Sequence, residues 1–322
     1  MQIQWSKSFS FGLVAVVVAM LCVACGQAEQ SEGGAIAVWS TVQPQKYFVE
    51  RVGGDMVSAK VLVRPGQSPE MYAPSVAQMA QLAQADVYFG IGMPIEASLF
   101  KRMRSSMTGV RLVQTGDEIL EYQDHSACAH GHHDHGENDP HIWMDPVRMI
   151  AVVEQIHDVL TDVQPDSAAV FDQNADALIA DLVELDGAIR AQLAPYAGRA
   201  FFINHPALGH FAERYGLVQL SIEKSGASPS AGRVAELISQ AREAQVGAIF
   251  TQPEFGRTTA TILADALDLN VVELNVLPAD YIIGMTIITD AHAVPTGCET
   301  KPWLPWCCSN SLLPTPHATF TC

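Results

Sequence analysis

Potential metal-binding side chains are concentrated between Asp124 and Pro146. A histidine-rich tract is followed there by His141, in the sequence Asp-Pro-His-Ile-Trp. Neutral imidazole is the commonest side-chain ligand for transition metals, and such tracts are typical of metal-collecting segments. We therefore predict capture of a divalent ion, with residues 124–138 as an accessory collector; a merely polar loop is the alternative for that tract. Besides Cys128, the tract carries His125, His130, His132, His133 and His135.

Composition and charge restrict the class of protein. The chain has 322 residues, of which 48% are apolar and 16% charged, so it is globular and long enough for one large domain or two lobes. Its formal net charge of −17 argues against nucleic acid as a partner, because phosphate binding needs a basic surface. The same acidity favours solubility and the gathering of cations.

The first 25 residues have the features of a lipoprotein-type export signal. Lys7 precedes the apolar stretch Phe11 to Ala24, which is short for a membrane span and long enough for a signal peptide. The residues Leu21 to Cys25 resemble a bacterial lipobox, with Cys22 where leucine is usual, which implies lipid attachment to Cys25. An uncleaved anchor is the alternative. Either way, we expect an extracytoplasmic protein, in the periplasm or at the cell surface, that is membrane-anchored by lipid.

Strand-length apolar runs alternate with helical patterns in two halves of the chain, residues 26–160 and 199–290. Near-continuous apolar strands of this kind are typical of parallel sheets covered by helices on both faces. We predict an α/β fold with two lobes, each a mostly parallel sheet flanked by helices. The expected strands are Ala35–Ser40, Val57–Val63, Val87–Gly92, Val110–Thr115, Ala200–His205, Leu217–Ile222, Gly247–Gln252 and Asn270–Asn275; the clearest helical patterns are Ser75–Ala85 and Gly232–Ala244.

A long helix is predicted between the halves, within residues 161–198. Pro165 to Ala194 has helical periodicity without an internal proline, and about 30 helical residues would span about 45 Å. Asp162 or Asp166 could cap its start, and Pro195 fits its end. Such a rigid connector would limit how far the lobes can hinge.

The last segment, residues 291–322, breaks the pattern with its prolines and with Cys298, Cys307, Cys308 and Cys322. Disulfides among them are possible in an oxidising compartment, and a poorly ordered terminus is the alternative. We assign this tail no function.

Four polar residues fall at or just beyond the ends of predicted strands or after the histidine-rich tract. They are Glu70, His141, His205 and Asn275, two from each half. Ligands of open α/β sheets bind at the carboxyl ends of strands, so a cleft between the lobes would bring these residues together. Two imidazoles and one carboxylate form a workable zinc set, with the fourth position left to Asn275, water or Asp280.

Several segments together resemble the metal-binding lipoproteins of bacterial zinc and manganese ABC importers, the cluster A (class III) solute-binding proteins. The resemblance covers roughly Ile36 to Met285 and implies two lobes, a long backbone helix, a metal in the interlobe cleft, and delivery to the membrane subunit of an ABC permease. The segments are P-G-x-x-P-x-x-Y-x-P (Pro65 to Pro74), Ala85 to Glu96, D-P-H-I-W-M-D-P (Asp139 to Pro146), Asn204 to Leu217 and Val272 to Tyr281.

The resemblance also assigns site residues by position. His141 and His205 match metal ligands of the family, whereas Glu70 stands where the family has its first histidine and Asn275 where it has an aspartate. The carboxylate gained offsets the one lost. Manganese binders of the family have glutamate at the position of His205, and nitrogen-rich ligand sets favour zinc, so we predict Zn²⁺, with Mn²⁺ as the alternative.

Three kinds of function remain at this stage. We expect a non-catalytic, monomeric receptor that captures zinc and docks on a permease. A surface adhesin or metal-buffering lipoprotein without transport is an alternative that uses the same scaffold. A zinc-dependent hydrolase is disfavoured, because the chain has no H-E-x-x-H or comparable catalytic arrangement, although Glu254 or Glu273 could be nominated as a base.

Overall fold

The computed structural model describes residues 34–115, 139–223 and 229–293. The export signal with Cys25, the histidine-rich tract 124–138 and the tail from residue 294, with its four cysteines, lie outside the described residues. None of the helices in the described segments is long and apolar enough to cross a membrane.

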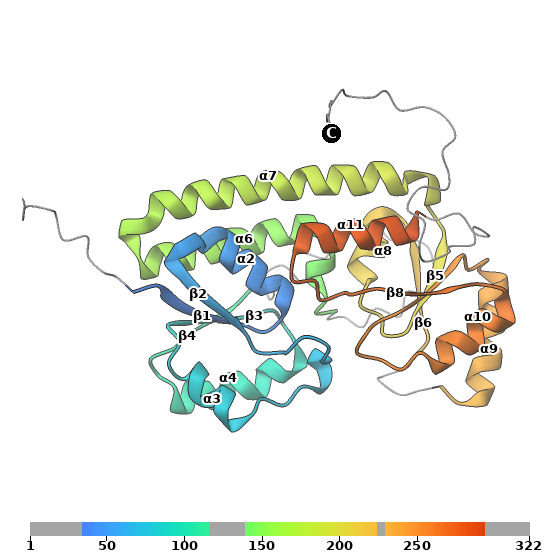
Figure 1. Ribbon diagram of the computed structural model, residues 1–322, viewed down its shortest axis with the longest axis horizontal. Coiled ribbons are helices and arrows are strands. Elements are labelled where there is room, and N and C mark those ends of the chain that lie inside the picture. The colour runs from blue at the N-terminus through green and yellow to red at the C-terminus, as the bar shows by residue number, and fades with distance from the viewer. Residues whose placement is uncertain (1–33, 116–138, 224–228, 294–322) are drawn as a thin grey trace, which may run out of the picture. The chain divides into compact units, whose positions relative to one another are not determined.

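The first lobe is built on a four-stranded parallel sheet with the order β2-β1-β3-β4 (Figure 1). Ile36 pairs with Val57 at one end of the sheet, and every residue of the central strand β3 is buried. Each strand lies inside an apolar run that the sequence predicts. The strands are β1 (Ile36–Ser40), β2 (Val57–Val61), β3 (Val87–Gly90) and β4 (Arg111–Gln114).

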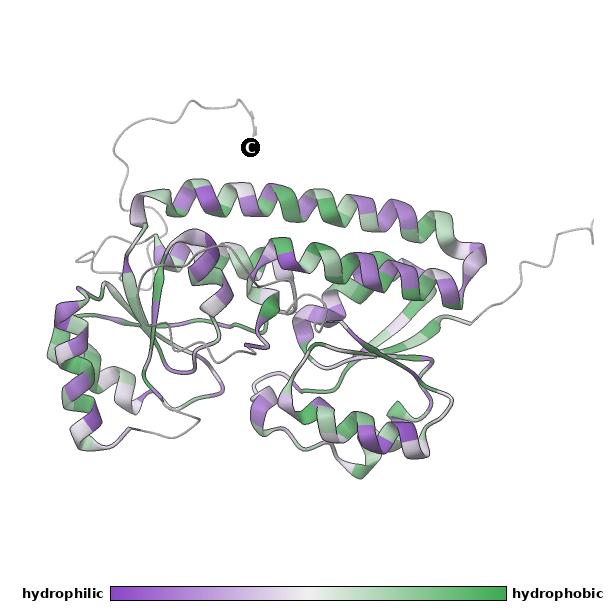
Figure 2. Cartoon of the chain, turned by 180° about the vertical axis from the view of Figure 1, so that it is seen from behind, coloured by the Kyte–Doolittle hydropathy of each residue, from purple (hydrophilic) through white to green (hydrophobic). Residues whose placement is uncertain are grey.

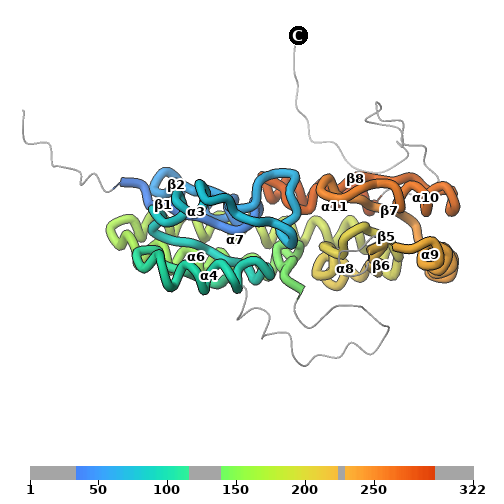
Figure 3. The backbone as a smooth tube through the Cα atoms, turned by 90° about the horizontal axis from the view of Figure 1, so that it is seen from below, coloured from blue at the N-terminus to red at the C-terminus, as the bar shows by residue number. Residues whose placement is uncertain are grey.

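The second lobe repeats this topology with the order β6-β5-β7-β8, again all parallel. Figure 3 shows β1 and β2 in one half of the chain and β5 to β8 in the other. The strands end earlier than the sequence predicts, so His205 and Asn275 lie in the loops beyond them. The strands are β5 (Ala200–Ile203), β6 (Val218–Ser221), β7 (Ala248–Thr251) and β8 (Val271–Glu273).

Helices cover both faces of each sheet, as parallel strands buried on both sides require. In the first lobe, α3 and α4 pack on one face, and α2 and α6 on the other; in the second lobe, α9 and α10 face α8 and α11. Figure 2 shows apolar and polar residues alternating around these helices. The helices are α2 (Gln43–Gly53), α3 (Val76–Leu82), α4 (Pro94–Ser106), α6 (Pro146–Val163), α8 (Gly209–Tyr215), α9 (Ala231–Glu243), α10 (Thr258–Leu267) and α11 (Tyr281–His292).

The connecting helix α7 (Ala168–Leu193) is confirmed, but it is shorter than predicted. It has 26 residues and therefore spans about 39 Å. The predicted caps are wrong: a 3₁₀ turn, Pro165–Ser167, precedes the helix, and its N-cap position is Ser167. Pro195 lies in the turn that follows the helix, as expected.

The two lobes share a large apolar cluster, in addition to a smaller separate cluster in each lobe. The large cluster contains buried residues of both sheets and of α7. Phe48 of α2 and Tyr281 of α11 come from different lobes, and their ring centroids are 4.7 Å apart. Between the lobes, Trp143 Nε1 donates a hydrogen bond of 2.8 Å to the backbone oxygen of Val276. A continuous core restricts hinge motion of the lobes, because opening it would expose apolar surface.

Asp145 adds a polar connection between the lobes. Its Oδ1 caps α6 by accepting from the backbone nitrogen of Val147 at 2.9 Å, and it also accepts from Arg214 Nε of α8. The second oxygen accepts from Arg148 Nε at 3.3 Å. The Asp145 side chain is nearly fully buried, so these bonds offset the cost of burying its charge.

We expect replacement of Asp145 by alanine to lower the free energy of unfolding by about 3 kcal/mol, because the cap and a buried ion pair are lost together. Urea denaturation would measure the loss. The matched control is Asp158→Ala, which removes an exposed carboxylate from the same helix and should change stability by less than about 0.5 kcal/mol. Equal effects of the two substitutions would contradict the interlobe role.

Candidate metal site

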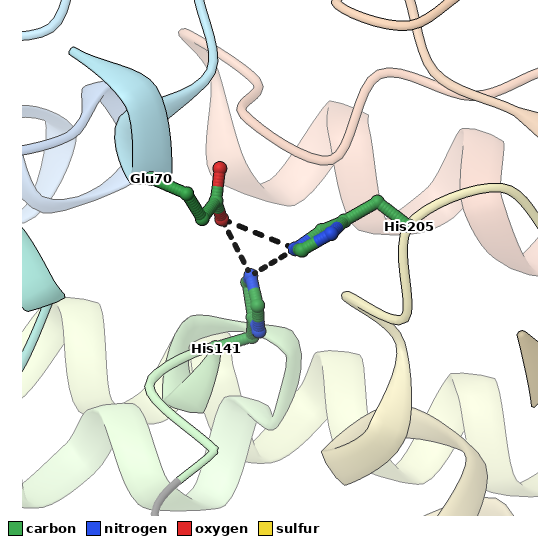
Figure 4. Close-up of side chains that lie close together, drawn as sticks. All are labelled: Glu70, His141 and His205. Carbon is green, nitrogen blue, oxygen red and sulfur yellow. Dashed lines mark hydrogen bonds and ion pairs between the residues drawn. The ribbon is translucent and has the colours of Figure 1, made fainter. Parts of the chain in front are cut away.

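Glu70, His141 and His205 converge on one point (Figure 4). Glu70 lies in the 3₁₀ turn Pro69–Met71 after β2, His141 immediately precedes the 3₁₀ turn Ile142–Met144, and His205 follows β5. Glu70 Oε1 is 3.3 Å from His141 Nε2 and 3.1 Å from His205 Nε2, and the two Nε2 atoms are 3.3 Å apart. Both lobes therefore contribute residues to the candidate site.

These spacings fit a bound metal ion. Ligand atoms held at about 2.0–2.2 Å from a tetrahedral zinc ion lie about 3.4 Å from one another. The three observed separations are 3.3, 3.1 and 3.3 Å. The triad could therefore bind zinc with little rearrangement.

Each of the three side chains is oriented by a further polar group. His141 Nδ1 donates to Asp139 Oδ1 at 2.6 Å, and His205 Nδ1 donates to Glu223 Oε1 at 2.5 Å. The second oxygen of Glu70 accepts from Ser68 Oγ. Carboxylates that accept from the outer nitrogen of a metal-binding histidine fix the tautomer and raise the basicity of the ring.

These hydrogen bonds make the site favourable for a cation. With Nδ1 of both rings donating a proton, a neutral ring has its lone pair on Nε2. Two Nε2 lone pairs and a Glu70 carboxylate oxygen then point at the same small volume. Such a convergence of electron pairs is favourable only when a metal ion or protons lie among them.

The pKa values of the three residues are shifted by the same hydrogen bonds. Burial opposes the charged forms of all three residues, but the mutual hydrogen bonds outweigh it. Hydrogen bonds from His141 and His205 hold the pKa of Glu70 well below its usual range. Asp139 and Glu70 raise the pKa of His141, and Glu223 and Glu70 raise the pKa of His205 to about 9. In the absence of a metal, protons on the imidazoles therefore take the place of the cation.

Neighbouring residues hold His205 in place. The side-chain amide of Gln252 accepts from the His205 backbone nitrogen at 3.1 Å and donates to its backbone oxygen at 2.7 Å. The ring of Phe255 stacks on the imidazole, with an interplanar angle of 12°. On the other side of the site, His210 Nε2 donates to the backbone oxygen of Asp139 at 3.0 Å, so this buried histidine supports the segment that orients His141.

The structure does not bring Asn275 into the triad. Asn275 is exposed, and its Oδ1 accepts from the backbone nitrogen of Leu277 at 2.9 Å. Asp280, the other residue considered for the fourth position, is also exposed and caps α11 by accepting from the backbone nitrogen of Ile283. Cys25 and the five histidines of the tract lie outside the described residues.

The sequence did not predict that three acidic residues lie next to the triad. Asp139 and Glu223 orient the imidazoles, and Glu254 lines the same cavity as the triad. Asp139 stands in the motif D-P-H, so its proximity to His141 could have been found. Glu223 lies 18 residues beyond His205, and only the parallel pairing of β5 with β6 brings them together.

The cavity at the triad is small. Its volume is ≈ 10 Å³, about the space of a single ion or water molecule. Pockets for organic ligands are typically about 300–1,000 Å³. The site therefore has room for an ion, and its volume gives no support to the hydrolase hypothesis.

Comparison with known proteins identifies the family. The family described as "ZnuA: Zinc-uptake complex component A periplasmic" matches residues 38–290. The chain belongs to this family. The description names a periplasmic component of a zinc-uptake complex and not an enzyme, in agreement with the prediction of a non-catalytic protein.

Two curated relatives and one solved structure illustrate the relationship. The zinc-binding lipoprotein AdcA of Streptococcus pneumoniae (strain ATCC BAA-255 / R6) is 31% identical over 275 residues, which cover 82% of this chain and 54% of AdcA. The manganese-binding lipoprotein MntA of Halalkalibacterium halodurans is 24% identical over 268 residues (80% and 86%). A crystal structure of ZnuA superposes with a TM-score of 0.72 at 28% identity and covers 80% of this chain and 100% of that one.

The ZnuA family confirms the predicted α/β fold with two lobes. The chain spans about half the length of the first curated relatives it matches, including AdcA. Their full-length activities are therefore not carried over to this chain as findings.

Metal affinity should depend on pH, because the ion competes with protons for Nε2 of both histidines. The raised pKa of His205, about 9, means that metal binding displaces a proton at neutral pH. Zinc affinity should then fall by up to about tenfold for each proton displaced per unit decrease in pH between about pH 9 and pH 6. Chelator competition across this range measures the slope. The variant Glu223→Gln, which removes the carboxylate that raises this pKa, should show a flatter slope; an unchanged slope would contradict the coupling.

The triad and the histidine-rich tract can be separated by substitution. We expect His141→Ala to weaken tight zinc binding by more than about 100-fold, because it removes a proposed ligand whose ring is oriented by Asp139. Deletion of residues 124–138 should leave the tight site intact. Calorimetry with a competing chelator distinguishes the two. The control His157→Ala removes a histidine of α6 that pairs with Asp158 and Asp172 and should have no effect. Greater loss from the tract deletion than from His141→Ala would overturn the assignment.

Proposed function

We propose that this protein is an extracytoplasmic receptor that captures Zn²⁺ between its lobes and delivers it to the membrane subunit of an ABC-type permease. Glu70, His141 and His205 are the proposed ligands. The observation that carries the proposal is the convergence of their three donor atoms, each oriented by Ser68, Asp139 or Glu223. The family's description as a zinc-uptake component supports the transport role.

The choice of zinc over manganese rests on the donor atoms. Two imidazole nitrogens and one carboxylate form a ligand set common in zinc sites, whereas manganese prefers sites rich in oxygen. His205 is the decisive residue, since a glutamate in its place would make the set oxygen-rich. The related MntA is a manganese-binding lipoprotein, so Mn²⁺ is the competitor to include in each binding experiment.

Release of the ion needs local rather than global motion. Opening the cleft as a hinge would break the shared core and expose residues such as Trp143 and Tyr281, which are fully buried. Glu70, by contrast, lies in a short 3₁₀ turn within a loop whose residues 64–67 are exposed. We propose that movement of this loop opens the site when the receptor docks on its permease.

The remaining parts of the proposal concern location and assembly. We propose that Cys25 carries a lipid that anchors the mature protein as a monomer on the outer side of a membrane. The related AdcA and MntA are lipoproteins, which supports this placement. Substitution of Cys25 by serine should release the protein from the membrane fraction and abolish labelling by a fatty acid.

Binding and uptake are tested separately. A variant with asparagine at all five tract histidines should bind one zinc ion per chain in calorimetry and prefer it to manganese. In the host, deletion of the gene should slow growth and reduce uptake at limiting zinc. The wild-type gene and the control His157→Ala should restore uptake, whereas His141→Ala should not. Stoichiometric binding with unchanged uptake would replace transport by metal buffering or adhesion.

A further inference from the structure

We propose that Glu254 supplies the fourth protein ligand of the bound ion, in the role that the sequence assigns to Asn275. The inference rests on the proposed metal-binding function and concerns the composition of that same site. Zinc in proteins usually has four ligands, and the proposed triad would supply three of them.

The walls of the metal cavity leave one candidate among the described residues. Apart from the triad, the lining contains a single side chain with an oxygen that can bind a cation, and this is Glu254. The indole of Trp143 has only a donor, which is already bonded to Val276. The other lining residues are Pro69, Ala207, Phe255, Val276 and Leu277.

One oxygen of the Glu254 carboxylate is also available to bind a cation. Its Oε2 is buried, and within the described part of the chain it has no hydrogen-bond partner. Burying a carboxylate oxygen without a partner is costly, so such atoms are uncommon in folded proteins. Coordination of a cation would give this oxygen a partner and remove the cost of burying it unpaired.

The chain around Glu254 is fixed to the site. Gln252 holds both backbone groups of His205, and Phe255 stacks on the His205 ring. Glu254 lies between these two residues in sequence. Its backbone is therefore held beside one of the proposed ligands, and only its side chain has to move.

A side-chain rotation is part of the proposal. The donor atoms of the triad lie within 4.8 Å of one another, and Glu254 is not in this group. Glu254 also borders a neighbouring cavity of ≈ 230 Å³ that it shares with Arg64 and Asn275, so its side chain has space in which to turn. We infer that the carboxylate swings from this border toward the ion when the ion binds.

Asn275 is a poorer candidate for geometric reasons. It lines the larger cavity and not the cavity at the triad, and its side-chain oxygen accepts a hydrogen bond from the backbone nitrogen of Leu277. An amide oxygen is also a weaker ligand for a dication than a carboxylate, because it has no net charge.

The test compares Glu254→Gln with Glu273→Gln in the full chain. Glu273 is half-exposed, pairs with Arg257 at 3.9 Å and does not line the metal cavity, so its substitution removes the same charge nearby without removing a ligand. Glu254→Gln should weaken zinc binding by about 10–100-fold, and Glu273→Gln should leave the affinity within about twofold of wild type. Cobalt(II) absorption and zinc X-ray absorption should show the loss or replacement of one carboxylate oxygen in Glu254→Gln only.

The outcomes separate this inference from the proposed function. Absence of stoichiometric zinc binding by the wild-type protein would overturn both. Tight binding by Glu254→Gln with unchanged cobalt spectra would overturn the inference alone and leave water in the fourth position. A loss in Asn275→Ala without one in Glu254→Gln would also overturn it. Thermal unfolding without metal checks that the variants fold; should Glu254→Gln fail, Glu254→Asp keeps the charge, shortens the reach and should still weaken binding.

Discussion

The candidate site depends on two hydrogen bonds, one from each imidazole, that lie on the side of the ring away from the shared centre. Asp139 and Glu223 each accept from Nδ1, and this is what turns Nε2 of His141 and His205 toward the shared centre. Without those bonds, either ring could adopt the other tautomer or rotate, and the three donor atoms would not converge. The carboxylates that do not touch the ion thus determine whether there is a site at all.

The shared core explains how segments from two lobes can keep donor atoms about 3 Å apart. Each sheet places a loop at its carboxyl edge, but a sheet alone does not fix the distance to the opposite lobe. That distance is set by the buried contacts across the interface, such as Phe48 with Tyr281, and by the hydrogen bond from Trp143 to Val276. The same contacts that form the site restrict its opening, so the mobile part has to be a loop.

The sequence predicted all eight strands of the described segments and three of the residues that converge, because both depend on local patterns. Apolar runs mark strands, and His141, His205 and Glu70 fall just beyond strands or inside motifs. The ends of strands were less predictable: β5 and β8 stop before His205 and Asn275, since pairing with neighbours determines the last residue of a strand. Similarly, the cap of α7 was mispredicted because Asp162 lies in the last turn of α6 and Asp166 lies within the 3₁₀ turn that precedes α7.

Asn275 was grouped with the triad because it follows a strand, yet its direction depends on a loop contact that sequence does not reveal. Its oxygen bonds to Leu277, two residues away, and this local bond competes with any interaction across the cleft. Glu223 and Glu254 carried no motif, and their relation to His205 arises only from the order of strands β6, β5 and β7 in the second sheet. Contacts that depend on the pairing of strands distant in sequence therefore could not be predicted from local patterns.

The exchange of residues at positions 70 and 275 moves the carboxylate of the site from one lobe to the other. The resemblance implies a histidine in the first lobe and an aspartate in the second, whereas this chain has Glu70 and Asn275. Glu70 Oε1 lies within 3.3 Å of both Nε2 atoms, so the negative charge lies between a histidine of the first lobe and a histidine of the second. This charge resides in the loop that precedes α3, so in the proposed site the residue best placed to release the ion would also be the one that binds it most strongly by charge. A loop movement that withdraws Glu70 would therefore weaken the site more than withdrawal of a neutral histidine from the same position.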